Sequence, residues 1–312
     1  MIRISNLDFA YAHAPVLHNI NLHIEAGSVT ALVGANGAGK TTLMRCIAGL
    51  EQPLRGSIGV AGMDVAQAPR SVHRVLGYLS DSFGLYPDLT IARCFEYAAA
   101  SQGLPEKYIA DAIQRTAAQL QLSDRLGQTC AVLSRGLRQR VAIGQAIIHQ
   151  PQLLLLDEPA SGLDPEARSE LAILFKQLQA QGMTLLVSSH ILSELEAYST
   201  HLLVLRAGQV LENRALAPNT PQPNRSRRLK IMLASDYPDW ASLLQKHGLV
   251  VQNCESHTAV CGFTGTLEQQ AALLAALVQD GLPIVYFAED KENLEQTYLR
   301  SLQTPSVTEN KA

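Results

Sequence analysis

The order of apolar and polar residues predicts a core with two kinds of β-structure. In LHNINLHIEAG, Ile20, Leu22 and Ile24 alternate with polar side chains, which is typical of a half-buried antiparallel strand. SVTALVG, PQLLLLDEP and GMTLLVSSH are short, continuous apolar runs that predict central strands of a parallel sheet. HLLVLRAGQVLE predicts a hairpin with Gly208 at its turn. Residues from about 87 to 150 are mostly helical in pattern, so we expect an α/β fold with a helical subdomain.

A change in composition after Glu212 marks the end of this core, residues 1–212. Residues 213–228, NRALAPNTPQPNRSRR, contain three prolines and almost no large apolar side chain, which predicts a linker with a solvated basic cluster. Residues 229–302 then follow the order βαββαβ with a last helix, which predicts a small α+β, ferredoxin-like accessory or regulatory domain. Thr266 and Gln269 are spaced for a capping box. Residues 303–312 are expected to be a flexible tail.

Composition and charge narrow the class of protein. A length of 312 residues predicts two domains, and 47% hydrophobic with 17% charged residues is typical of folded globular chains. The net charge of −3 gives no reason to expect nucleic acid as a partner. No apolar run reaches the ~18 residues of a membrane span, and MIRISNLDFAY lacks the order of a signal peptide, so we expect a cytosolic protein. The five cysteines form no CxxC pair, which predicts buried free thiols.

The strongest chemical signal is GANGAGKTT, which matches the P-loop pattern GxxxxGK[ST] between a predicted strand and a predicted helix. The glycines let successive N–H groups converge on phosphate oxygens. Lys40 offers a point charge to the β- and γ-phosphates, and the Thr41 hydroxyl can ligate Mg²⁺. The predicted nucleotide-binding residues of this loop are Gly34, Asn36, Gly37, Ala38, Gly39, Lys40, Thr41 and Thr42.

Two further strand ends carry candidate catalytic side chains. Asp157 ends the run in LLLLDEP, where it can hold Mg²⁺ through water, and Glu158 can polarise the attacking water as a general base. His190 ends the run in SSHIL, and we expect its strand to neighbour those of the P-loop and Asp157. The carboxyl ends of parallel strands share one edge of a sheet, so these groups should meet there. Lys40, Glu158 and His190 are therefore the predicted catalytic residues.

A second anion site is predicted at LSRGLRQRVAIGQA. Ser134 occupies an N-cap position, Gly136 leaves the backbone open, and Leu137 and Val141 lie on one apolar face, so this stretch opens a helix. The free N–H groups at a helix start bind anions. The residues alone leave open why one chain has two phosphate cradles.

In their order along the chain, the P-loop, LSRG, LLLLDEP, SGLDP and SSHIL resemble the nucleotide-binding subunit of an ABC transporter over residues 2–212. The resemblance implies an ATPase that acts as a head-to-tail homodimer with two sandwiched ATP molecules. It implies that Ser134 and Gly136 contact the γ-phosphate held by the P-loop of the second subunit, which explains the second cradle. It also implies that Tyr11 stacks on adenine and that Asp164 in SGLDP lies along the dimer interface.

The signature differs from the family pattern LSGGQ. Arg135 and Leu137 replace the first glycine and the glutamine. Arg135 and Arg138 either add positive charge near the γ-phosphate or face water.

A second difference lies in GYLSDSFGLYPDLT. Asp81 stands where many family members have a glutamine that contacts Mg²⁺ and water. A carboxylate at this position can still bind the metal through water, so Thr41, Asp81 and Asp157 are the expected metal ligands. The P-loop and the predicted catalytic residues match the pattern, and we expect an active ATPase.

An acidic residue at position 81, LYPDLT after it, a basic residue inside the signature and an appended C-terminal domain resemble the ATPases of type-2 ABC exporters. That resemblance implies separate integral membrane permease subunits, with a permease helix docked near Ser80–Tyr97. The chain would then be cytoplasmic and peripheral on the inner face of the cell membrane. Apolar and aromatic surface at the groove is expected from Phe83, Leu85, Tyr86, Phe95 and Tyr97, and some of these five must instead be core residues of the helical insertion.

Two other functions share part of the pattern. A soluble ABC-family ATPase that acts on nucleic acid or in translation would have the same ATPase motifs. Such proteins usually carry two ATPase cassettes in one chain or a long coiled-coil insertion, and neither is seen in this sequence. A P-loop kinase would share only residues 34–41 and would not need LSRG or SGLDP.

Overall fold

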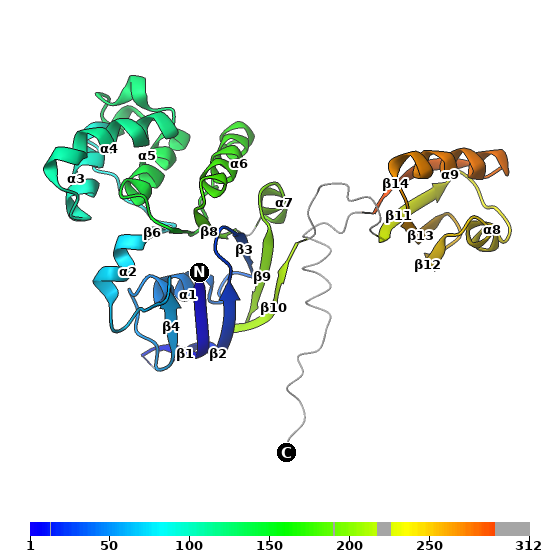
Figure 1. Cartoon of the computed structure of the whole chain (residues 1–312), viewed down its shortest axis with the longest axis horizontal. Helices are drawn as coiled ribbons and strands as arrows, with labels where there is room; N and C mark the ends of the chain where they lie inside the picture. The colour runs from blue at the N-terminus through cyan, green and yellow to red at the C-terminus, as the bar shows by residue number, and fades with distance from the viewer. Residues whose placement is uncertain (13, 190, 217–225, 291–312) are drawn as a thin grey trace, which may run out of the picture. The chain divides into compact units, whose positions relative to one another are not determined.

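The computed structural model describes residues 1–12, 14–189, 191–216 and 226–290. The described residues form two compact units, residues 1–216 and residues 226–290 (Figure 1). Two buried apolar clusters lie in the first unit and one lies in the second. Each unit therefore has a hydrophobic core of its own.

A six-stranded sheet in the order β10-β9-β3-β8-β7-β6 forms the centre of the first unit. Its first five strands in chain order are parallel, and β10 pairs antiparallel with β9 at one edge. Every residue of β3, β7 and β8 is buried, which confirms the prediction from the continuous apolar runs. The strands are β3 (Val29–Val33), β6 (Leu76–Leu79), β7 (Leu153–Leu156), β8 (Thr184–Ser188), β9 (His201–Arg206) and β10 (Gln209–Ala215).

The hairpin between β9 and β10 turns at the predicted glycine. Ala207 and Gly208 have φ angles of 45° and 73°, and two positive φ angles are the mark of a type I′ hairpin turn. A Cβ at Gly208 would lie 2.1 Å from the carbonyl oxygen of Val16, so only glycine fits between the turn and β2. The Gly208 N–H donates to the carbonyl of Ala38 at 3.0 Å, and the turn thereby supports the glycine loop.

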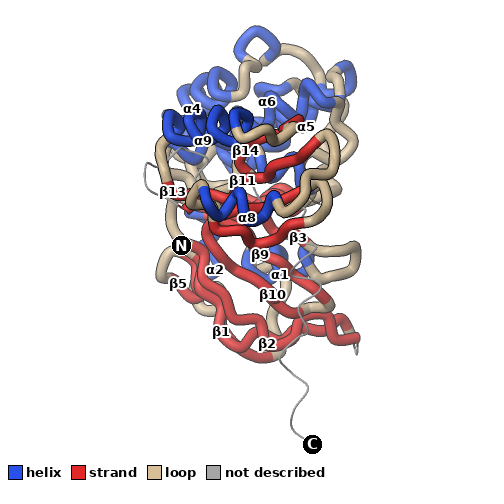
Figure 2. The backbone as a smooth tube through the Cα atoms, turned by 90° about the vertical axis from the view of Figure 1, so that its right-hand side faces the viewer, coloured by secondary structure: helices blue, strands red, loops and turns tan. Residues whose placement is uncertain are grey.

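A second, antiparallel sheet in the order β2-β1-β4-β5 packs over helix α1 (Lys40–Ile47). Ile20, Leu22 and Ile24 are buried as the alternation predicts. Strand β2 lies beside β10 (Figure 2). The Asn213 side chain donates to the carbonyl of His23 at 3.0 Å. The strands are β1 (Ile2–Tyr11), β2 (Ala14–Ile24), β4 (Arg55–Val60) and β5 (Met63–Asp64), and α2 (Pro69–Val75) follows them.

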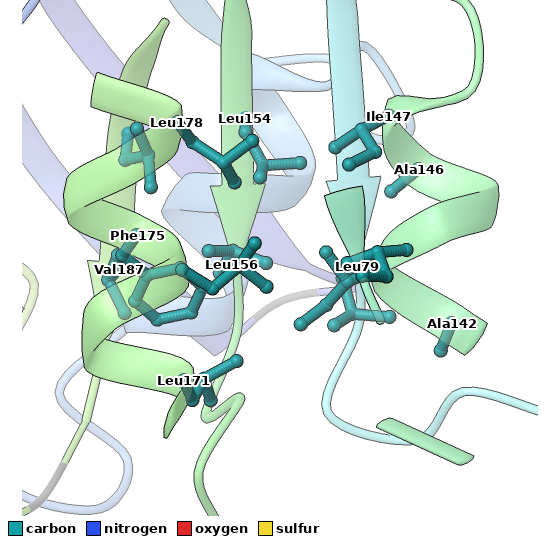
Figure 3. Close-up of a cluster of buried hydrophobic side chains, with 14 of the residues drawn as sticks. Leu79, Ala142, Ala146, Ile147, Leu154, Leu156, Leu171, Phe175, Leu178 and Val187 are labelled. Carbon is teal, nitrogen blue, oxygen red and sulfur yellow. The ribbon is translucent and has the colours of Figure 1, made fainter. Parts of the chain in front are cut away.

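The predicted helical subdomain contains α3, α4 and α5, which group together in Figure 1. Helix α5 and helix α6 reach opposite ends of the same core, where their apolar side chains meet Leu79, Leu154 and Leu156 of the central sheet (Figure 3). The helices are α3 (Ile91–Ser101), α4 (Glu106–Gln119), α5 (Arg135–Ile147), α6 (Pro165–Ala180) and α7 (Leu192–Glu196), with short 3₁₀ turns at Ser123–Arg125 and Cys130–Val132.

All five cysteines are free thiols, as predicted, and only Cys254 is partly exposed. Burial raises the pKa of Cys46 and of Cys94 to about 12, so both stay protonated near neutral pH. Their contribution is therefore to packing.

The second unit has the predicted βαββαβ order in an antiparallel sheet, β12-β13-β11-β14. Its elements are β11 (Ser226–Leu233), α8 (Trp240–Lys246), β12 (Val250–Cys254), β13 (Thr258–Thr264), α9 (Leu267–Gln279) and β14 (Ile284–Glu289). The capping box is confirmed, since Thr266 Oγ1 accepts from the Gln269 N–H and Gln269 Oε1 accepts from the Thr266 N–H. The last predicted helix and the tail 303–312 lie outside the described residues.

The predicted linker is too long at both ends. Strand β10 continues past position 212 because Asn213 pairs with Leu203 and Ala215 pairs with His201. Strand β11 begins at Ser226 through its pairing with Thr264. Polar residues can extend an edge strand because main-chain groups make the pairing, and composition therefore misplaces its end.

The expectation that the basic cluster is solvated is wrong for Arg227. Its guanidinium is buried against the Phe263 ring and donates to Gln270 Oε1 and to the carbonyl of Gly265. Arg228 forms an ion pair with Asp290 at 3.3 Å. Long basic side chains can bury their stems when the head finds partners, which composition does not reveal.

We predict that the first unit folds without the second. A chain ending at Leu216 should stay soluble and bind ATP with the affinity of the full chain, because both of its cores end before residue 217 among the described residues. A chain ending at Glu212 is the matched control, since it removes three paired residues of β10. It should melt roughly 6–12 °C lower, at about 1 kcal/mol for each of the three lost pairings and about 2–4 °C for each kcal/mol. Thermal unfolding and nucleotide titration measure both effects, and an insoluble chain ending at Leu216 would contradict the prediction.

Candidate functional site

The glycine loop joins β3 to α1, and the start of this helix has no side-chain cap. Gly39 is the N-cap of α1 with a φ of 103°, no side chain caps the helix, and its first turn has no acid. The first N–H groups of a helix have no partner within the helix, so these amides can bind an anion. A Cβ at Gly34 would lie 2.3 Å from the carbonyl of Leu205, which explains the glycine at the loop's start.

Lys40 lies at the centre of this loop and is only 7% exposed. Its Nζ donates to the carbonyls of Gly34 at 2.8 Å and Ala35 at 3.4 Å. The same nitrogen lies 3.9 Å from Glu158 Oε1. The structure therefore brings the P-loop cation next to the predicted general base. Thr41 is exposed in the first turn and Thr42 is buried.

Asp157 and Glu158 follow β7 at the carboxyl edge of the sheet. Asp157 is 1% exposed, and its Oδ1 accepts a hydrogen bond of 2.5 Å from Ser188 Oγ. Its Oδ2 is buried without a hydrogen-bond partner among the described residues. The Glu158 N–H donates to the same Ser188 hydroxyl at 2.9 Å, and Glu158 has a left-handed φ of 48°. Sequence reasoning missed Ser188, although it stands two positions before His190.

Asp81 lies near the same edge, because β6 and β7 are paired. The Asp157 N–H donates to the carbonyl of Leu79 at 2.9 Å, and Asp81 follows two residues later with an exposed side chain. Tyr78 was also missed. Burial raises its pKa to about 12, and the charge of Asp157 adds to the shift, so a neutral phenol lies among these acids.

Tyr11 is the last residue of β1 and is 42% exposed. Its ring packs edge-on against the Phe9 ring, with 4.8 Å between the ring centroids. Strand β1 pairs with β2, whose Leu17 would touch a Cβ at Gly39. Tyr11 therefore lies on the strand that pairs with the one bordering the glycine loop. His190 lies outside the described residues. Its strand β8 lies between β3 and β7 as predicted.

Ser134 is the N-cap of α5, as predicted, and its hydroxyl accepts from the Leu137 N–H at 3.3 Å. Ser134 is exposed, and Gly136 lies where a Cβ would come within 3.3 Å of the Ala167 side chain. The helix start is therefore accessible, and it approaches α6 closely.

Arg135 does not simply face water. Its guanidinium donates to the carbonyl of Ser161 at 2.8 Å and covers Gly162, where a Cβ would meet it at 2.4 Å. Arg138 donates to the carbonyl of Leu133 at 3.1 Å. Asp164 is the N-cap of α6 and accepts from the Ala167 N–H at 2.8 Å. Arg135 thus joins the LSRG loop to the SGLDP loop of the same chain.

The expected docking surface is only partly available. Tyr86 and Tyr97 are each 62% exposed, whereas Phe83 and Leu85 are partly buried. Phe95 is fully buried, and a Cβ at Gly144 would lie 2.4 Å from its ring. Phe95 is therefore one of the five that belong to the core, because the close approach of α3 and α5 at Gly144 turns this side chain inward.

Comparison with known proteins agrees with the geometry. Residues 17–161 match the family model described as ABC transporter. The chain is 34% identical over 201 residues to the ABC transporter ATP-binding protein NatA of Bacillus subtilis, which covers 64% of this chain and 82% of NatA. This chain belongs to the ABC transporter ATP-binding proteins. A solved structure, the "ATP binding subunit of ABC transporter", matches with a TM-score of 0.63 and 32% identity, over 69% of this chain and 90% of that one.

A further relative of this ABC ATP-binding subunit extends over the second unit. The bacitracin transport ATP-binding protein BcrA of Bacillus licheniformis is 28% identical over 302 residues, which is 96% of each chain. The P-loop ABC ATPase fold and the assignment as an ATPase and ATP-binding subunit are therefore confirmed. Among the described helices, none has the length and apolarity needed to cross a bilayer.

Proposed function

We propose that this ATPase energises a separate membrane permease, with hydrolysis carried out by groups at the carboxyl edge of the central sheet. The observation that carries the proposal is the convergence of Lys40, Asp157 and Glu158 next to an uncapped helix start. The loop amides and Lys40 bind the triphosphate, and Glu158 polarises the attacking water. Tyr11 offers a ring for adenine, and His190 follows strand β8 in the sequence.

Mg²⁺ fits this edge of the sheet. Asp157 Oδ2 is buried and has no hydrogen-bond partner among the described residues, and Thr41 and Asp81 stand at neighbouring element ends. The described residues hold no cluster of three or more metal-ligating side chains, and Mg²⁺ in such sites takes one or two carboxylates with substrate phosphates. When bound, the ion would neutralise charge on the phosphate oxygens.

The LSRG helix start is proposed to serve the nucleotide of a second copy of this chain. This role is supported by the exposure of Ser134 and by the helix start at α5, where Ser134 is the N-cap and Gly136 is partly exposed. The Arg135 contact with Ser161 holds this loop together with SGLDP, the second loop expected at the dimer interface. ATP would then close the dimer, and closure would move the permease.

Export is the proposed direction, and the subunit would lie on the inner face of the membrane through its permease. Asp81, LYPDLT, the arginine in the signature and the second unit support this reading. The full-length match to a protein named for bacitracin transport also favours it. A soluble role in translation or nucleic-acid work stays the alternative.

We predict that Tyr97 binds the permease. Tyr97→Asp should weaken the complex at least roughly 30-fold, because burying a charge at an aromatic anchor costs more than 2 kcal/mol. Tyr108→Asp is the matched control, since Tyr108 is 53% exposed on the neighbouring helix α4. The quantity measured is the amount of integral membrane protein that co-purifies with the tagged chain from detergent-solubilised membranes.

Equal recovery of that membrane protein with Tyr97→Asp and Tyr108→Asp would contradict the docking site. Co-purification of ribosomes or nucleic acid without any membrane protein would instead favour the soluble alternative.

A further inference from the structure

One buried hydroxyl connects the two acids of the proposed site. Ser188 is the last residue of β8 and is fully buried. Its Oγ donates to Asp157 Oδ1 at 2.5 Å and accepts from the Glu158 N–H at 2.9 Å. A serine hydroxyl has one hydrogen to donate, so this donor is committed to Asp157.

The first bond fixes the rotation of the Asp157 carboxylate. With Oδ1 held by Ser188, Oδ2 is the oxygen left without a partner among the described residues. A hydrogen bond to a charged oxygen is stronger than one between neutral groups, and burial strengthens it further. Asp157 therefore presents one defined oxygen to the position where Mg²⁺ fits.

The second bond holds the backbone of Glu158. A left-handed φ is unfavourable for a residue with a Cβ, and such conformations persist only where the surroundings hold them. The Ser188 hydroxyl provides a partner for the N–H of this residue from the neighbouring strand. The carboxylate of Glu158 thereby stays beside Lys40, 3.9 Å away.

We propose that Ser188 is a positioning residue for ATP hydrolysis, which sets the metal-facing oxygen of Asp157 and the backbone of Glu158 through one hydroxyl. The inference rests on the proposed roles of these two acids. Ser188 is fully buried, and the side-chain hydrogen bonds found for it among the described residues go to Asp157 and Glu158.

The test compares Ser188→Ala with Ser28→Ala. Ser28 is also a buried serine, but it precedes β3 at the opposite edge of the sheet and bonds to the Glu25 carbonyl. The binding of a fluorescent ATP analogue is measured with Mg²⁺ and with EDTA, together with the Mg²⁺ dependence of hydrolysis. Ser188→Ala should bind as the unchanged chain does in EDTA, need about tenfold more Mg²⁺ for tight binding, and lose about 10- to 100-fold in kcat. Ser28→Ala should match the unchanged chain in all three.

Unchanged Mg²⁺ dependence and kcat in Ser188→Ala would overturn the inference. An equal loss of nucleotide affinity in EDTA and in Mg²⁺ would also overturn it, because it would indicate general damage to the sheet. If Ser188→Ala is insoluble, Ser188→Cys replaces it, because this variant keeps the side-chain shape with a weaker donor. Ser188→Cys should give the same Mg²⁺-dependent loss. A Mg²⁺ dependence and a kcat equal to those of the unchanged chain would reject the role of the hydroxyl. Glu158→Gln separates the two claims, since full hydrolysis in that variant would reject the proposed function itself.

Discussion

Glu158→Gln should slow ATP hydrolysis by about 10²- to 10⁴-fold while nucleotide binding is retained, since that is the usual contribution of a positioned general base. The amide has the shape of the carboxylate but does not accept the proton of the attacking water. The glycine loop and Lys40 are untouched, so the triphosphate cradle keeps its amides and its cation. The variant should also accumulate an ATP-bound dimer, which size-exclusion chromatography with ATP would detect.

Glu106→Gln provides the control for this first result. Glu106 is an exposed acid in the first turn of α4, so the same chemical change there should leave the hydrolysis rate unaltered. Phosphate release measured at saturating ATP decides the matter. A Glu158→Gln variant that hydrolyses ATP at the rate of the unchanged chain would remove Glu158 from the mechanism.

The second large effect should appear across two subunits. Ser134→Arg should abolish hydrolysis and ATP-driven dimerisation, because a bulky cation would block the helix start that we propose meets the γ-phosphate. Nucleotide binding to the single chain should stay nearly intact, since the P-loop and Tyr11 are unchanged. Lys40→Ala should be inactive for a different reason, the loss of the P-loop cation and of nucleotide affinity.

Mixing these two inactive chains tests action between subunits. A mixed dimer has one composite site with both defects and one site where an intact Lys40 meets an intact Ser134. Random pairing leaves about a quarter of all composite sites intact, so hydrolysis should return to at most about a quarter of that of the unchanged chain. If Ser134 acted on the ATP of its own chain, every site would keep a defect. Mixed dimers shown by mass spectrometry but inactive would therefore reject our explanation for the second cradle.

Local patterns predicted the elements and much of the proposed site. The strands β3, β7 and β8 can be recognised in the sequence because both of their faces are buried, which makes each a continuous apolar run. The P-loop can be recognised because its residues are close together in the sequence. The N-caps at Ser134 and Thr266 were found for the same reason. These features depend only on residues within a few positions of one another.

Contacts between distant segments could not be predicted. Ser188 reaches Asp157 from a strand 31 residues away, and Arg135 reaches Ser161 across 26 residues, so no spacing rule connects them. Phe95 has an apolar pattern that fits a surface or a core equally well, and only the glycine opposite it decides. The burial of Arg227 could not be predicted because its partners, Gln270 and Gly265, lie 43 and 38 residues further along the chain.

The left-handed backbone of Glu158 means that the residue best for thermal stability at this position differs from the residue proposed for ATP hydrolysis. A residue with a Cβ is about 1–2 kcal/mol less stable than glycine in this conformation. A library varied at this position and screened only for survival at high temperature would therefore enrich glycine. The same library screened for ATP consumption would keep the glutamate. With the general-base role that we propose for Glu158, the subunit carries a small, permanent deficit in stability as a condition of its turnover, and a thermostabilised variant should be engineered at other positions.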